Sequence, residues 1–442
     1  MTDGKPNVVL IHSHDLGRHV GCYGRGVDTP HLESLAASGA VFENHFVSAP
    51  QCSPSRGSLH TGTYPHANGL LGLAHHGWAL DDDVAAMPQL LADAGYETHL
   101  FGLQHVTDDP AALGFQHDHS EWRVTPTSAA LLDATRARTV ADSVETFLDA
   151  GAYREPFFAS VGFFEAHRIE VGDSFRFDDG TYDPADPEDV ECPPFLPDGP
   201  GTRADLAELE GMVAAIDDAV GRVVDAIDAE GLREDTLVVF TTEHGIAFPR
   251  AKGCCYDGGI EAALVMRYPG VVAADTRHDE LLSNVDVLPT ILDLVAGADP
   301  GDVDGRSFLA LATGQEYLPR EQVFAEMTWH DRYNPMRAVR TERYKYIRNC
   351  WHLPAVTLPN DVFASEAGRE VREEYYLSRR PYEELYDLRS DPDERENLAG
   401  DDAYEHVRAE LEGRLVAWMR RTDDPLLDGP VPPADMDQIE PW

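Results

Sequence analysis

Five short apolar runs recur over the first 266 residues of the chain, and helical patterns separate them. The runs are Val8–Ile11, Thr98–Phe101, Phe157–Phe163, Thr236–Thr242 and Ala263–Met266. Apolar runs of this length are typical of buried strands, and their alternation with helices is typical of a parallel sheet covered on both faces. The sequence therefore predicts an α/β fold with a largely parallel sheet flanked by helices, which we expect at Pro30–Ser38, Met87–Ala94, Ala130–Ala150 and Asp205–Ala229.

The pattern changes near residue 320. A strand pair over Arg337–Arg348, a strand over Glu384–Leu388 and an amphipathic helix over Ala403–Arg421 follow. We therefore expect an α/β catalytic domain over residues 1–320 and a smaller α+β subdomain over residues 321–442, packed on the first. Val171–Gly201 is rich in Asp, Pro and Gly without periodicity, which predicts a long surface excursion.

Charge excludes several classes of partner. With 35 Lys and Arg against 79 Asp and Glu, the formal net charge is −44, so neither nucleic acid nor an anionic membrane is expected as a partner. A hydrophobic content of 43% supplies enough apolar material for a globular core. Lysine occurs only three times, and an acidic, lysine-poor protein is typical of salt-adapted cells, although a GC-rich genome would also favour arginine.

The two ends of the chain and its cysteines carry less information. The N-terminal residues lead into an apolar strand without a signal-peptide pattern, and no window reaches transmembrane length, so a cytoplasmic location is expected. Six scattered cysteines are too few for a disulfide scaffold, and adjacent Cys254 and Cys255 are expected to be structural. The pairs His75-His76 and Trp329-His330 are compatible with either a pocket wall or a surface loop.

Polar residues follow three of the predicted strands directly. His14 and Asp15 follow the first run, His167 follows the third, and Glu243 and His244 follow the fourth. Ligand sites of parallel sheets collect at the carboxyl ends of the strands, so we expect these side chains to lie together. Imidazole and carboxylate groups after two separate strands could hold one divalent cation.

The most informative motif is Cys52–Arg56, which reads Cys-Ser-Pro-Ser-Arg and is followed by Leu59 and Gly62. At ordinary residue frequencies, Cys-x-Pro-Ser-Arg arises by chance in about one chain in a thousand of this length. A lone cysteine would most often be a small buried hydrophobe, but this context favours chemistry. The motif resembles the sulfatase signature of the alkaline-phosphatase-like superfamily.

The resemblance extends over nearly the whole chain. Segments similar to the family's metal loops and its other motifs occur at Asn7–Gly17, Thr61–Leu70, Thr241–Gly245, Asn284–Leu292 and Glu384–Leu398. Within the family, the chain looks most like the sulfamidase- and heparan-sulfatase-like branch. The resemblance implies an alkaline-phosphatase-like fold and a smaller C-terminal unit.

The resemblance also implies a mechanism. Cys52 would be converted to formylglycine by generating machinery in the host, and its hydrated form would be the nucleophile. Four further residues would be catalytic, namely Arg56, His105, His167 and Lys252. One divalent cation, Ca²⁺ by resemblance, would be held by His14, Asp15, Cys52, Glu243 and His244. His167 or His105 would give the leaving group its proton.

Three departures from the family pattern are specific. The family usually has Asp-Asp where this chain has His14-Asp15, and Asp followed by Asn or His where it has Glu243-His244. Imidazole is a softer ligand than carboxylate, so with two histidines in the set Mn²⁺ and Zn²⁺ are alternatives to Ca²⁺ as the bound cation. Leu103 stands where the family has a lysine that contacts the substrate anion.

The leading hypothesis is a sulfatase that hydrolyses a sulfate ester or a sulfamate of a small sulfated substrate such as a sulfated sugar. Two alternatives stay open because of the departures. One is a phosphonate monoester hydrolase or phosphodiesterase of the same superfamily, and the other is a catalytically idle, sulfatase-like glycan binder. Oligomeric state and natural substrate stay open at this point.

Overall fold

The computed structural model describes residues 4–120, 129–296 and 301–435. Its centre is an eight-stranded sheet in the order β11 (Thr276–His278), β2 (Ala40–Phe42), β10 (Leu264–Arg267), β9 (Thr236–Thr242), β1 (Asn7–Ser13), β6 (Phe157–Gly162), β4 (Glu97–Gly102) and β5 (His117–Asp118). The five strands from β9 to β5 are parallel, and only β10 runs antiparallel to its neighbours. The prediction of a largely parallel α/β sheet is confirmed.

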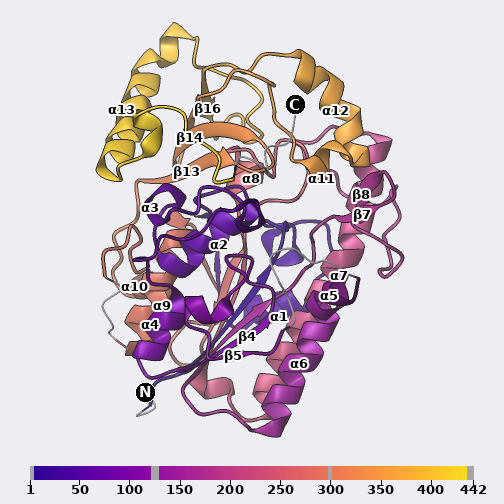
Figure 1. Cartoon of the computed structure of the whole chain (residues 1–442), viewed down its shortest axis with the longest axis vertical. Helices are drawn as coiled ribbons and strands as arrows, with labels where there is room; N and C mark the ends of the chain where they lie inside the picture. The colour runs from indigo at the N-terminus through magenta and orange to yellow at the C-terminus, as the bar shows by residue number, and fades with distance from the viewer. Residues whose placement is uncertain (1–3, 121–128, 297–300, 436–442) are drawn as a thin grey trace.

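Two hydrophobic cores form because successive residues of a strand face opposite sides of the sheet. Val9 and Ile11 of β1 pack into one core, whereas Val8 and Leu10 pack into the other. Figure 1 shows the helices on the two sides. The first core is covered by α1 (Pro30–Ala37), α6 (Ala137–Ala150) and α7 (Pro200–Ala229), and the second by α2 (Cys52–Thr61), α4 (Met87–Asp93) and α9 (Val287–Ala296).

The expected helices exist, with two differences. The pattern over Ala130–Ala150 is divided into α5 (Ala129–Thr135) and α6, because Arg136 between them is extended, with φ −63° and ψ 142°. The guanidinium group of Arg136 forms ion pairs with Asp133 and Asp179. The second difference is the start of α7, which begins at Pro200 rather than Asp205, since proline suits the first turn of a helix.

A second sheet follows in the C-terminal part of the chain. It is antiparallel and has the order β13 (Gln322–Trp329), β14 (Tyr333–Thr341), β15 (Tyr344–Asn349) and β16 (Glu383–Asp387). Helix α13 (Glu405–Arg421) packs on it through a core that contains Leu415 and Trp418. The expected strand pair, strand and closing helix are confirmed, and β13 was missed. The domain boundary at residue 320 stays a prediction.

The predicted excursion over Val171–Gly201 begins with a hairpin of β7 (Ile169–Val171) and β8 (Ser174–Arg176), and no other described strand or helix occurs before α7. Short elements complete the described chain: β3 (His45–Phe46), β12 (Leu282–Ser283), α3 (Pro65–Asn68), α8 (Asp257–Ile260), α10 (Leu309–Ala312), α11 (Asn360–Phe363) and α12 (Glu366–Leu377). Among the described helices, none is both long and apolar enough to cross a membrane.

Candidate active site

Cys52 is the first residue of helix α2, which Figure 1 shows between the central sheet and the C-terminal strands β13 and β14. All ten residues of the helix are buried, and Cys52, its first residue, is 1% exposed. Asn284 fixes the helix from outside, because its side-chain amide donates to the carbonyl of Ser55 over 3.0 Å. The first helical turn, which carries free backbone N–H groups, therefore points into the protein rather than into solvent.

The polar residues that follow β1 and β9 meet around this thiol. His14 Nδ1 lies 2.6 Å from Glu243 Oε1, and His244 Nε2 lies 3.1 Å from Asp15 Oδ1. Cys52 Sγ lies 3.6 Å from His244 Nε2. The expectation that these side chains lie together is confirmed by these distances.

This group of side chains fits a divalent cation. One possible ligand atom from each of His14, Asp15, Cys52 and Glu243 lies within 4.8 Å of all the others, and all four residues are buried. Two carboxylates, an imidazole and the atom at the head of α2 form a donor set that suits a hard or borderline divalent ion. His244, which contacts both carboxylates, stands beside this group.

Two buried cations neutralise the carboxylates. Arg56 forms an ion pair with Glu243 and contacts the ring of His12. Lys252 Nζ lies 2.8 Å from Asp15 Oδ2 and 2.7 Å from Asp361 Oδ2. Both cationic side chains are 1% exposed, so each is held by its partners rather than by water.

The charges shift the pKa values of the site. Burial alone would raise the pKa of the Cys52 thiol, yet the Lys252 charge and hydrogen bonds with His105, His14 and His244 hold it well below its usual range. Burial likewise opposes ionisation of Asp15, and Lys252 nevertheless lowers the pKa of that carboxyl to about 2. The site therefore favours negative charge at the position of Cys52 and on Asp15.

Two more of the expected histidines face the same group. The ring centroids of His105 and His167 lie 5.4 Å and 5.2 Å from that of His14. His167 Nδ1 lies 2.7 Å from the carbonyl oxygen of Arg168, so Nδ1 carries the proton and donates it. Burial lowers the pKa of both rings, which leaves them neutral near pH 7. A neutral His167 then has its lone pair on Nε2.

Leu103 is 1% exposed and packs against Ala74. The position at which the family has a lysine is therefore filled by apolar packing. His75 stands nearby, since its ring is parallel to that of His105 at a centroid separation of 5.6 Å. Of the pairs that sequence reasoning left open, His75 thus belongs to the surroundings of the site. Cys254 and Cys255 are buried, and burial raises the pKa of both thiols, as expected for structural cysteines.

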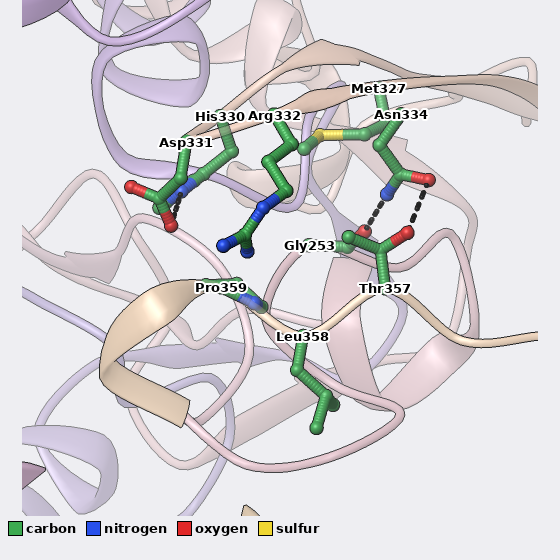
Figure 2. A pocket seen from close by; sticks show the side chains of 9 residues that line it. All are labelled: Gly253, Met327, His330, Asp331, Arg332, Asn334, Thr357, Leu358 and Pro359. Carbon is green, nitrogen blue, oxygen red and sulfur yellow. Dashed lines mark hydrogen bonds and ion pairs between the residues drawn. The ribbon is translucent and has the colours of Figure 1, made fainter. Parts of the chain in front are cut away.

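Sequence reasoning missed Asp361, His12 and Asp331, and it left His330 open between a pocket wall and a surface loop. His330 Nδ1 lies 3.0 Å from Asp331, and this carboxylate raises the pKa of the ring to about 9 against the effect of burial. Figure 2 shows a small pocket lined by both residues, into which the side chain of Arg332 points. Only the Trp329-His330 pair gave a signal in the sequence, since Asp361 belongs to no motif.

Comparisons with known proteins show which family this chain is similar to. A model of the family described as sulfatase matches residues 6–298, and one described as N-sulphoglucosamine sulphohydrolase, C-terminal, matches residues 243–358. The human N-sulphoglucosamine sulphohydrolase is 31% identical, over 96% of this chain and 92% of the relative. An ulvan-active sulfatase of Formosa agariphila is 28% identical, over 95% of this chain and 81% of the relative.

Solved structures share the fold. The crystal structure of a phosphonate monoester hydrolase of Agrobacterium radiobacter superposes with a TM-score of 0.73 at 21% identity, covering 95% of this chain and 96% of that one. This likeness confirms the alkaline-phosphatase-like architecture that the signature implied. Because the sulfatase family model covers well over half of the sequence, and because a relative above 30% identity spans nearly all of it, the chain belongs to the sulfatase family and is a sulfuric ester hydrolase.

Proposed function

We propose that the chain hydrolyses a sulfate ester or a sulfamate of a small sulfated sugar, with Cys52 converted to formylglycine by machinery of the host. The observation that carries this proposal is the position of Cys52. It heads a buried helix, its thiol is 3.6 Å from His244, and its pKa is held well below the usual range by the charges around it. A formylglycine at this position would supply, in its hydrated form, a hydroxyl group that attacks sulfur.

The cation proposed for the site is Ca²⁺, with Mn²⁺ or Zn²⁺ as alternatives because two imidazoles stand in the ligand set. His14, Asp15, Cys52, Glu243 and His244 would hold it. When bound, such a cation polarises a sulfate oxygen and favours the ionised form of the nucleophile. Close packing of the donor atoms, all of them buried, supports this assignment.

The other four residues act directly on the substrate in this proposal. Arg56 and Lys252 place two positive charges against the sulfate oxygens, where negative charge accumulates in the transition state. One guanidinium nitrogen of Arg56, Nη2, is buried and has no hydrogen-bond partner within the described part of the chain. A sulfate oxygen would give it one. His167, whose Nε2 lone pair can first accept the proton that the attacking hydroxyl releases, would pass that proton to the leaving atom, or His105 would do so.

Two observations support a sulfated sugar as the substrate. The relative at 31% identity is named for hydrolysis of N-sulphoglucosamine. The pocket in Figure 2 adds Arg332 and His330, whose high pKa keeps it cationic at neutral pH, so a polar and anionic molecule would be held there. With a net charge of −44, the protein attracts such an anion only locally.

Mass spectrometry of the Cys52 peptide tests the mechanism, and elemental analysis of the same sample identifies the cation. We expect the aldehyde form of the peptide, about 18 Da lighter than the thiol peptide and unreactive toward iodoacetamide, and one divalent ion per chain at the catalytic site. Alkylation is needed because the hydrate has nearly the mass of the thiol. Turnover of N-sulfated and O-sulfated glucosamine is measured in parallel. An unmodified thiol in a preparation that cleaves these substrates would contradict the formylglycine mechanism. Fully modified, metal-loaded protein that only binds them would instead identify an idle glycan binder.

A second candidate activity is phosphonate monoester or phosphodiester hydrolysis, which the phosphonate monoester hydrolase neighbour accommodates within the same fold. The observation that favours it is the buried Leu103 at the lysine position, which removes one positive charge near the substrate anion. A panel of aryl sulfates, phosphonate monoesters and phosphodiesters separates the two activities by kcat/KM. We expect Leu103→Lys to raise kcat/KM for the aryl sulfates relative to the phosphonate monoesters and phosphodiesters, because it restores the lysine of the family pattern.

Three further expectations stay proposals. We propose that residues 1–320 and 321–442 are two structural units, that the protein acts in the cytoplasm, and that it comes from a salt-adapted cell. The last rests on the surplus of 44 negative charges and on the near absence of lysine. Limited proteolysis tests the first, because cleavage near residue 320 should yield two fragments that stay associated.

A further inference from the structure

A cluster of histidines lies on the edge of the central sheet, apart from the active site. β4 and β5 are neighbouring parallel strands, and His99 on β4 pairs in register with His117 on β5. Side chains alternate between the two faces of a strand, so Glu97, two residues before His99, and His119, two residues after His117, lie on the same face. The sequence places four potential ligands on one side of a two-stranded edge.

The nitrogen and oxygen atoms of this cluster converge. His99 Nε2 lies 3.4 Å from Glu97 Oε2, and His117 Nε2 lies 3.3 Å from Glu97 Oε1. One ligand atom from each of these three residues lies within 4.8 Å of the others. Ligand atoms of a tetrahedral zinc site with bonds of 2.0–2.1 Å are about 3.3–3.4 Å apart. Each of the two histidines stands at such a distance from one oxygen of Glu97.

His99 contacts a second imidazole through its other ring nitrogen. Its Nδ1 lies 3.1 Å from His119 Nε2, and in the tautomer with the proton on Nδ1 this contact is a hydrogen bond to His119 that leaves the lone pair of His99 on Nε2. His99 is 2% exposed, and its Nε2 is buried and has no hydrogen-bond partner within the described ranges. A buried ring nitrogen without a partner is costly unless something occupies the position it faces.

The carboxylate is positioned as well. The backbone N–H of Arg154 donates to Glu97 Oε2 over 2.7 Å, which fixes the side chain at the edge of the sheet. A cavity of about 530 Å³ lies beside the three histidines, bordered also by Phe147 and Asp142.

We propose that Glu97, His99 and His117 bind one late first-row divalent cation, Zn²⁺ in first place, with His119 orienting His99 and a water completing the shell. Imidazole and carboxylate donors together suit Zn²⁺ rather than Ca²⁺. β5 is only two residues long and pairs with β4 alone, so a cation shared by the two strands would cross-link the edge of the sheet.

This site is separate from the catalytic cluster. Glu97 and His99 lie in the first half of β4, whereas His105 follows the carboxyl end of the same strand at Gly102. Figure 1 shows β4 and β5 in the lower half of the molecule, away from α2 in the upper half. The side chain of His117 is 47% exposed, so a cation reaches the cluster from solvent without passing the active site.

Titration with Co²⁺ as a spectroscopic substitute for Zn²⁺ tests the proposal. The catalytic ligands are disabled by Asp15→Asn, so that only the edge cluster is observed in the metal-free full-length protein. We expect one Co²⁺ per chain with the visible absorption of an imidazole-bound ion, and displacement by Zn²⁺. The additional change His117→Ala should weaken binding by at least about 100-fold. Its matched control is His406→Ala on α13, another exposed histidine, which should leave the spectrum unchanged.

Thermal unfolding gives a second readout. Zn²⁺ at 100 times its Kd should raise the Tm of the Asp15→Asn protein by about 3 °C, and should leave the variant with His117→Ala unchanged. Glu97→Gln serves as a second variant and should weaken binding in the same direction. Equal Co²⁺ affinity with and without His117 would overturn the proposal. So would loss of all bound Co²⁺ on Asp15→Asn alone, because the ion would then belong to the catalytic cluster.

Discussion

Replacement of Lys252 by methionine removes the one ammonium group that two buried carboxylates share. Asp15 and Asp361 lie 2.8 Å and 2.7 Å from its nitrogen, and none of the three side chains is more than 8% exposed. Methionine keeps most of the side-chain volume, so the loss is electrostatic rather than a cavity. Breaking a buried ion pair from one side costs about 3–5 kcal/mol, since a charge is left without its partner.

The pKa of Asp15 gives an independent measure of this loss. Its displacement from 3.8 to about 2, against the effect of burial and caused first by Lys252, corresponds to about 2 kcal/mol of folding free energy. A carboxyl with a lowered pKa stabilises the fold above its unfolded pKa, and this contribution disappears as the pH falls from about 4 to 2. We therefore expect Lys252→Met to lose stability at neutral pH and to lose this acid-side dependence as well.

Urea and thermal unfolding in EDTA and constant high salt measure the effect. An unfolding entropy of about 2.1 cal/mol/K per residue over the chain converts 3–5 kcal/mol into a fall in Tm of about 3–5 °C. Asp361→Asn in the Lys252→Met background removes one of the two unpaired charges and should restore about 1–3 kcal/mol. The reasoning is refuted if Lys252→Met matches the wild type, or if the second substitution adds to the loss instead of reversing part of it.

Three other outcomes are expected. Cys52→Ala should lower kcat on every cleaved substrate by at least about 10³-fold, with a Tm within about 2 °C of the wild type, because only a small buried thiol is lost. Asp331→Asn removes the carboxylate that raises the pKa of His330 to about 9, so the ring of the variant becomes neutral at pH 8. KM for an anionic substrate should then rise about tenfold, while kcat changes little. In the wild type the same rise in KM should appear only as the pH passes about 9. Transfer from molar to millimolar salt should lower both Tm and kcat/KM, because 44 uncompensated negative charges repel one another and the substrate; unchanged values would contradict the salt-adapted interpretation.

The order of strands and helices was readable from the sequence because each element carries its own periodicity. Val8–Ile11 and Thr236–Thr242 are apolar without interruption, and the residues that follow them had to emerge at the same edge. The strand Gln322–Trp329 was missed although Val323, Ala325 and Met327 alternate on one face, because its other face carries the polar residues Glu326 and Thr328, which are also buried. Glu326 is buried against a partner that lies far away in the chain. For Glu326 the partner is His66, 2.7 Å away.

The site was predictable to the extent that its residues belong to motifs. Asp361 has no such context, since it lies in a four-residue helix more than 100 positions after Lys252. Its role follows only from the distance between two side chains in the folded protein. His12 is similar, because nothing in the pattern of β1 distinguishes a histidine that contacts Arg56 from one that merely fills the sheet. Long-range pairing of this kind leaves no local signal.

Burial of α2 limits the time at which an enzyme can reach Cys52. Every residue from Cys52 to Thr61 is buried in the folded chain, so a second protein cannot bind this segment after folding. The proposed enzymatic conversion of Cys52 would therefore have to occur during synthesis or before the chain folds. A molecule that is not modified before it folds would keep the thiol of Cys52. The active fraction of a preparation would then depend on whether modification of Cys52 or folding of the chain happens first. Later incubation of the folded protein with the modifying enzyme would not increase that fraction.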